Sequence, residues 1–156
     1  MTNPVNRKDE ILKVARNLFL SKDYYKTTMV DIMEALEIAK GTIYHYFRSK
    51  EALFEAVIED IVEENIKHMR ALVENAPKNA LEKIQLLVNA GNISQENEKI
   101  IDQLHKPAND ALHSRLLAAT LMKQAPLYAE IIQQGCDEGI FRTEVPLECA
   151  EFILSA

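Results

Sequence analysis

The segment KGTIYHYFRSKEALF, residues 40–54, gathers aromatic, hydroxyl and basic side chains in a chain whose formal net charge is −6. Lysine, threonine, tyrosine and histidine can bond the phosphates of a duplex and the edges of its bases. A glycine among them lets the backbone approach closely. In this segment the residues with that chemistry are Lys40, Gly41, Thr42, Tyr44 and His45, with Tyr46 near the edge of the same surface.

A helix-turn-helix would place these residues correctly. Thr28 can cap a helix and form a capping box with Asp31, and a break follows at residues 37–39. The next helix covers about residues 40–47. Spacing at 100° per residue turns Ile43 and Phe47 toward the core and Gly41 and His45 outward. The pattern therefore predicts double-stranded DNA as the partner of this outward face.

Residues before and after the helix at about residues 40–47 are expected to contact DNA phosphates. Lys50 lies in the first turn of a following helix, where backbone N–H groups also favour an anion. Thr27 and Thr28 offer hydroxyl groups at the start of the preceding helix. We therefore expect Thr27, Thr28 and Lys50 to contact the DNA backbone.

Apolar spacing is helical along the whole chain, which predicts an all-α protein. The first helix is expected to begin near Asn6, and a long helix runs from a cap at Ser49 to about Asn75. His105 and His113 stand on either side of Pro107, so the sequence predicts different faces for them. The remaining predicted helices cover about residues 79–90, 94–105, 108–124 and 127–138, and a last one starts near Pro146.

Charge divides the chain in two. Residues 1–50 hold nine basic and six acidic residues, which gives +3, while residues 51–156 hold nine basic and eighteen acidic residues, which gives −9. A basic head on an acidic body indicates a polyanionic partner for the head. We expect a DNA-binding domain at residues 1–50 and a second helical domain at residues 51–156. The chain shows no membrane-length apolar run and no signal peptide, which favours the cytoplasm and no membrane partner.

The stretch TTMVDIMEALEIAKGTIYHYFRSKEALF resembles the DNA-binding segment of the TetR (tetracycline-repressor-like) family of transcriptional regulators. The resemblance extends from about Arg7 to Phe54. It implies a homodimer that binds a palindromic operator and leaves it when a small-molecule effector binds the helical body. It also implies phosphate contacts for Thr28, Tyr44, Tyr46 and Lys50. Family members carry one or two further helices that pair between subunits, so this chain is expected to be truncated within that region.

Two positions depart from the family pattern. Glu37 stands where the turn glycine is usual, and it must accept a less favourable backbone if the turn is left-handed there. Ala39 replaces the usual Ser or Thr cap of the recognition helix, which typically costs ~1 kcal/mol. We therefore expect a recognition helix that is loosely held until DNA orders it.

The body carries no enzyme motif, and neither a cofactor nor a metal is predicted. Met69, Met122 and Tyr128 could line an apolar effector pocket, although plain core positions would explain them too. Asp60, Glu64 and His68 share one helix face and would suit a helical metal-dependent enzyme, or simply a solvated acidic stripe. A third possibility is an interaction module that no longer binds DNA, as Glu37 and Ala39 would suggest. Cys136 and Cys149 are expected to be reduced, packed thiols.

Overall fold

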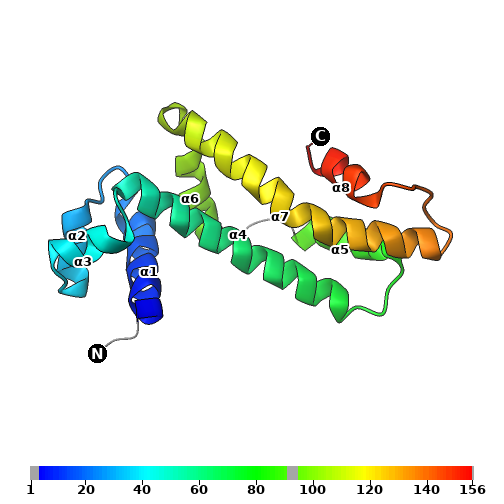
Figure 1. The fold of residues 1–156 in the computed structure, drawn as a ribbon, viewed down its shortest axis with the longest axis horizontal. Helices are drawn as coiled ribbons and strands as arrows, with labels where there is room; N and C mark the ends of the chain where they lie inside the picture. The colour runs from blue at the N-terminus through cyan, green and yellow to red at the C-terminus, as the bar shows by residue number, and fades with distance from the viewer. Residues whose placement is uncertain (1–3, 91–94, 156) are drawn as a thin grey trace. The chain divides into compact units, whose positions relative to one another are not determined.

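The computed structural model describes residues 4–90 and 95–155, and these residues form helices and no β-strand (Figure 1). The all-α prediction is therefore confirmed. Side chains are described for residues 7–90 and 97–155. The helices are α1 (Pro4–Lys22), α2 (Met29–Leu36), α3 (Lys40–Tyr46), α4 (Lys50–Glu74), α5 (Ala80–Ala90), α6 (Gln95–Leu104), the 3-10 turn η1 (Pro107–Asn109), α7 (Asp110–Asp137) and α8 (Pro146–Ser155).

The helices form two compact units. One unit comprises α1, α2, α3, α4 as far as Ile61, α6, η1 and α7 as far as His113. The other comprises α4 from Val62, α5, α7 from Ser114 and α8. These units follow contacts within the fold, and α6 joins the first of them although it lies far along the chain. The predicted domain division at residue 50 stays a prediction.

Aromatic rings fill the centre of the first unit. The ring of Tyr24 stacks on that of Phe54 at 4.1 Å between centroids, and Phe19 meets both rings edge to face. Ile11 and Ala15, two turns and one turn before Phe19, are fully buried on the same face of α1. This packing fixes the start of α4 against α1 and the loop after α1.

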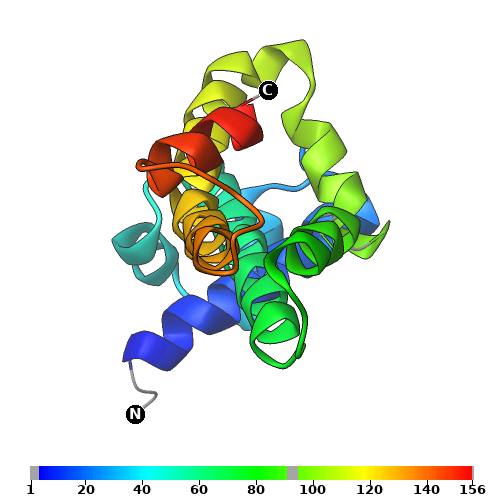
Figure 2. The ribbon, with the colours of Figure 1, turned by 90° about the vertical axis from the view of Figure 1, so that its right-hand side faces the viewer.

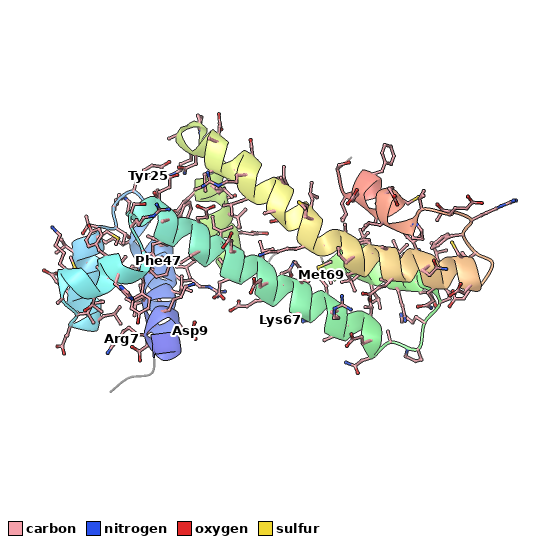
Figure 3. The ribbon with its side chains drawn as sticks, in the orientation of Figure 1. Arg7, Asp9, Tyr25, Phe47, Lys67 and Met69 are labelled. Atoms are coloured by element: carbon pink, nitrogen blue, oxygen red, sulfur yellow. The ribbon has the colours of Figure 1, made fainter. Side chains whose placement is uncertain are left out.

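The second unit has a core made by four helices. Residues of α4, α5, α7 and α8 share one buried cluster, to which α8 contributes Ala150. Figures 1 and 2 both show α8 lying beside the C-terminal half of α7. Met69 lies on the side of α4 that faces α7, whereas Lys67 lies on the opposite side (Figure 3).

Three local predictions were wrong. Helix α1 already includes residues 4–6, since a proline is favoured in the first helical turn. The two helices predicted at 108–124 and 127–138 are the single helix α7, which contains Pro126. Pro126 is exposed while its neighbours Ala125 and Leu127 are buried, so packing on both sides of the proline outweighs one lost hydrogen bond.

The third error concerns the two histidines. The rings of His105 and His113 meet edge to face at 4.8 Å between centroids. The short turn η1 lies between α6 and α7, and it brings the end of one helix back beside the start of the next. Pro107 is the first residue of that turn, and the turn allows the two histidine rings to come into contact.

Candidate nucleic-acid interface

Helix α2 begins with the predicted capping box. The hydroxyl of Thr28 accepts the N–H of Asp31 at 3.1 Å, and the Asp31 carboxylate accepts the N–H of Thr28 at 2.7 Å. Lys22 lies 2.8 Å from the other carboxylate oxygen. The bond from Lys22 and the bonds from Thr28 lower the pKa of Asp31 from 3.8 to about 2. Thr28 is exposed, but its side chain already supports its own helix.

The turn between α2 and α3 is left-handed at Glu37, so this residue does adopt the less favourable backbone. Glu37 has φ 53° and ψ 41°. Its N–H donates to the carbonyl of Glu34 at 3.2 Å, and the N–H of Ile38 donates to the carbonyl of Met33 at 3.1 Å. These two bonds form a Schellman motif, which glycine normally occupies at the left-handed position. Hydrogen bonding thus holds a backbone that the side chain disfavours.

Helix α3 has the predicted inward and outward faces. Ile43 is fully buried, and Phe47, the C-cap of α3, is nearly so. Ala39 has extended backbone at the N-cap and makes no side-chain bond to the helix. The outward side chains lie next to one another: the Lys40 ammonium is 5.8 Å from the Tyr44 ring, and the rings of His45 and Tyr46 meet at 5.1 Å.

Exposure along α3 follows the same division. A Cβ added to Gly41 would meet no atom within 4 Å, so the backbone there faces open space. Thr42 and Tyr46 are half-buried, while Lys40, Gly41, Tyr44 and His45 are exposed. The structure therefore places these six residues on the part of α3 that is not buried in the core. Their contacts with DNA stay a prediction.

Lys50 is held more closely than the sequence suggested. Its ammonium donates to the carbonyl of Tyr24 at 3.0 Å and lies 4.4 Å from the centre of that ring. Burial lowers the pKa of Lys50, and the nearby Asp23 carboxylate opposes this effect. Ser49 caps α4 as predicted, since its hydroxyl accepts the N–H of Ala52 at 3.0 Å. Lys50 thus links the start of α4 to the loop after α1.

Thr27 does not fit the predicted phosphate contact. Its side chain is 0% exposed, and its hydroxyl lies 2.7 Å from the carbonyl oxygen of Asp23 and 3.3 Å from that of Leu18. Its N–H also donates to Asp23 at 3.1 Å. Every donor of Thr27 is used inside the loop that precedes α2. The sequence could not distinguish it from Thr28, because two adjacent threonines face opposite sides of the chain.

Tyr24 is a supporting residue that the sequence reasoning missed. It packs on Phe19 and Phe54 and offers its carbonyl oxygen to Lys50. Burial raises the pKa of its hydroxyl, with Glu51 adding a smaller contribution. The pair of tyrosines in SKDYYK was a usable signal, because aromatic residues between two amphipathic helices often anchor the connecting loop in the core.

The predicted effector residues are not brought together as a set. Met69 is 1% exposed and Tyr128 is also buried, and both belong to the core cluster of the second unit. Burial raises the pKa of Tyr128. Met122 is 75% exposed and lies outside that cluster, so it lines no enclosed pocket with the other two. An effector contact by Met69 and Tyr128 stays a prediction.

The other side chains of interest in the body can be placed as well. Within residues 7–90 and 97–155, no three His, Cys, Asp or Glu side chains gather closely enough to hold a metal ion, and Asp60, Glu64 and His68 are included. Cys136 and Cys149 are free thiols that both contact Thr143. None of the described helices combines the length and apolar character that crossing a membrane requires.

Comparison with known proteins agrees with this architecture. Residues 11–57 match the family described as bacterial regulatory proteins of the tetR family, and residues 92–156 match the tetracyclin repressor-like C-terminal domain. An HTH-type transcriptional repressor, KstR2 of Mycolicibacterium smegmatis, is 26% identical over 151 residues, covering 94% of this chain and 73% of its own. The HTH-type regulator QacR of Staphylococcus aureus is 41% identical over 54 residues, 35% of this chain and 29% of its own.

A solved structure shows the same fold. The crystal structure of a TetR-family transcriptional regulator from Pectobacterium atrosepticum superposes with a TM-score of 0.74 at 20% identity, covering 97% of this chain and 78% of its own. The two family models together match more than two thirds of the chain. This chain therefore belongs to the TetR family. It is a DNA-binding transcriptional regulator with an N-terminal helix-turn-helix and a helical C-terminal domain.

Proposed function

We propose that this protein is a repressor that binds a palindromic operator as a homodimer in the cytoplasm and is released by a small-molecule effector. The repressor role is supported by the name of its KstR2 relatives, which are described as transcriptional repressors. Dimerisation and the effector are supported by membership of the family. An enzymatic activity is not part of this proposal, since members of the family are transcriptional regulators.

One observation supports the proposal that α3 binds DNA. Five side chains and one glycine of α3 lie outside the buried stripe of the helix, which contains Ile43. Among them, Gly41, Tyr44 and His45 are exposed, either farthest from that stripe or beside it. The side chains can act at base edges or phosphates, and the glycine allows the backbone to approach. In this proposal Thr28 and Lys50 are phosphate contacts at the edges of the surface, and Thr27 is not a contact. The residues on the α3 face are Lys40, Gly41, Thr42, Tyr44, His45 and Tyr46.

The first experiment selects genomic DNA fragments with the purified protein at near-physiological salt and sequences them. Enrichment of a palindrome is the expected result, because two symmetry-related recognition helices read two half-sites. A preference for a single unrepeated half-site would contradict the dimeric part of the proposal. Equal recovery of all fragments would contradict sequence-specific binding.

Gly41→Ala then tests the binding face. The added methyl group meets nothing in the free protein, so the variant should fold and α3 should gain slightly in helix propensity. If the backbone at Gly41 lies against the duplex, affinity for the enriched palindrome should fall about tenfold or more, as expected from a clash of roughly 1–3 kcal/mol. Lys13→Ala, which removes an exposed side chain of α1, is the control and should bind within about twofold of the wild type. Unchanged binding by Gly41→Ala would place DNA elsewhere.

A further inference from the structure

A cavity of about 400 Å³ opens at the surface of the first unit. The C-terminal end of α1, the loop after it, α6 and the residues just after α6 provide its wall. Four ammonium groups against two carboxylates give this wall a formal charge of +2, in a chain whose net charge is −6. The charged side chains are Lys22, Lys26, Lys99, Lys106, Asp23 and Asp102.

Two of the lysines have partners and two do not. Lys22 is paired with Asp31 at 2.8 Å. Lys106 lies 3.8 Å from a carboxylate oxygen of Asp23, with its ammonium 4.7 Å from the centre of the Tyr25 ring. Among the described side chains, no carboxylate lies within 4 Å of either Lys26 or Lys99, and both lysines are exposed. With the pairs of Lys22 and Lys106 set aside, Lys26, Lys99 and Asp102 leave the wall a net formal charge of +1 from the loop and from α6.

The floor of the cavity is fixed by a buried glutamine. Gln103 is 6% exposed, and its amide oxygen accepts the N–H of Tyr24 at 2.5 Å. Its amide nitrogen donates to the carbonyls of Lys99 and Phe19 at 2.9 and 3.4 Å. These bonds join α6 to α1 and to the loop. The backbone of the cavity wall is thus held in place by these bonds without a ligand.

We infer that this cavity binds a small anion with more than one negative charge, of the phosphate or diphosphate type, between Lys26 and Lys99. The net positive charge of the cavity wall favours an anion. A multiply charged anion gains more than a monoanion from two ammonium groups, and the two attractions together exceed the single repulsion from Asp102, which also grows with the charge of the anion. Lysine binds phosphate as a point charge, and the lysines supply all the positive charge of the cavity wall, since no arginine lines it.

Such an anion would join two elements that already contact each other. Lys26 belongs to the loop after α1 and Lys99 to α6, which pack together through Gln103 and through the Lys106–Asp23 pair. A bound anion would therefore stabilise the contact of α6 with α1 by mass action. The anion could come from a free phosphorylated small molecule or from a phosphate of DNA.

Calorimetric titration of DNA-free protein with inorganic pyrophosphate at constant ionic strength tests the site. Wild-type protein should bind one pyrophosphate, and the double variant Lys26→Gln/Lys99→Gln should bind it about tenfold or more weakly, because charged hydrogen bonds are lost. The matched control is Lys13→Gln/Lys67→Gln, which removes two exposed lysines that do not line the cavity. No binding by the wild type, or equal loss in both double variants, would overturn the proposal.

Two further measurements locate the anion and identify its source. Backbone amide shifts on adding pyrophosphate should concentrate in residues 20–26 and 99–106, and shifts spread evenly over the chain would contradict the site. With an operator duplex at the same salt, a cavity variant that keeps wild-type DNA affinity assigns the site to a free phosphorylated molecule. Parallel losses of pyrophosphate and DNA binding assign it to the DNA backbone. The pyrophosphate titration is informative even if the protein binds no operator.

Discussion

Helices α3 and α5 are both short, yet they are held at their N-terminal ends in different ways. Asn79 and Glu82 form a reciprocal capping box on α5, with both bonds at 3.0 Å, and Glu138, just after α7, accepts the N–H of Ala80 at 2.9 Å. Helix α3 has Ala39 at its N-cap and no such bond. The second unit therefore secures its helix by hydrogen bonds, some of them between distant residues, whereas α3 depends on its buried face.

In the first unit, the loop that is held by such hydrogen bonds is the one between α1 and α2. Asp23, with φ 76°, accepts the N–H of Tyr25 on its carboxylate, and its carbonyl accepts both donors of Thr27. Gln103 and Lys50 bind the same loop through Tyr24. The helix proposed to meet DNA therefore has no side-chain cap, whereas the loop between α1 and α2 in the same unit is held by several hydrogen bonds.

Thr27→Val should lower the free energy of unfolding by about 2 kcal/mol, since a buried hydroxyl that bonds two carbonyls is removed. DNA affinity at fixed salt should stay within about twofold once the protein is folded. Thr42→Val is the matched control: Thr42 is half-exposed on α3, so stability should hold while DNA affinity falls. Urea unfolding and duplex titration measure the two effects. If Thr27→Val kept normal stability but lost DNA binding, the prediction that Thr27 contacts a phosphate would be supported after all.

Glu37→Gly should raise the free energy of unfolding by about 1 kcal/mol, because glycine adopts the left-handed conformation without the steric cost that Glu37 bears. It also removes an exposed negative charge from the turn of the helix-turn-helix, which should strengthen duplex binding. Glu34→Gly is the control, since it removes the same charge from the body of α2 and should cost about 1 kcal/mol. Similar destabilisation in both variants would show that the turn is not strained at Glu37.

Ala39→Ser should supply the missing cap and stabilise α3 by about 0.5–1 kcal/mol. Hydrogen exchange of the amides of residues 40–47 in the absence of DNA is the sensitive measurement, because a better-held helix opens less often. Ala35→Ser adds the same hydroxyl inside α2 and should give no gain. Strong protection of residues 40–47 already in the wild type would argue against a loosely held recognition helix.

These differences also explain what could be predicted from the sequence. The exposure of the α3 face and the cap at Thr28 follow from spacing within a few residues, and both were anticipated. The burial of Thr27, the pairing of Lys50 with Tyr24 and the single helix through Pro126 depend on contacts with other elements. Met122 shows the same limit, because a spacing pattern cannot tell whether another helix covers a given side of α7.

The smallest effect concerns pH and Asp31. The folded pKa of Asp31 is about 2 because Lys22 and Thr28 bond its charged form, while the unfolded value is near the usual 3.8. A depressed folded pKa means that the unfolded chain takes up the proton first as pH falls. The stabilisation from Asp31 is therefore complete above about pH 4 and is lost between about pH 4 and pH 2.

Asp31→Asn isolates this contribution. The variant cannot ionise at residue 31, so its free energy of unfolding should fall less steeply than that of the wild type between pH 4 and pH 2. The two curves should run in parallel above pH 5, where Asp31 is charged in both states. Glu138, whose pKa is lowered by the N–H of Ala80 and by Gln134, titrates in the second unit and is left intact in both proteins. Following the amides of α2 by hydrogen exchange assigns the difference to the head, and identical slopes for the two proteins would show that the Thr28–Asp31 box contributes no pH-dependent stability.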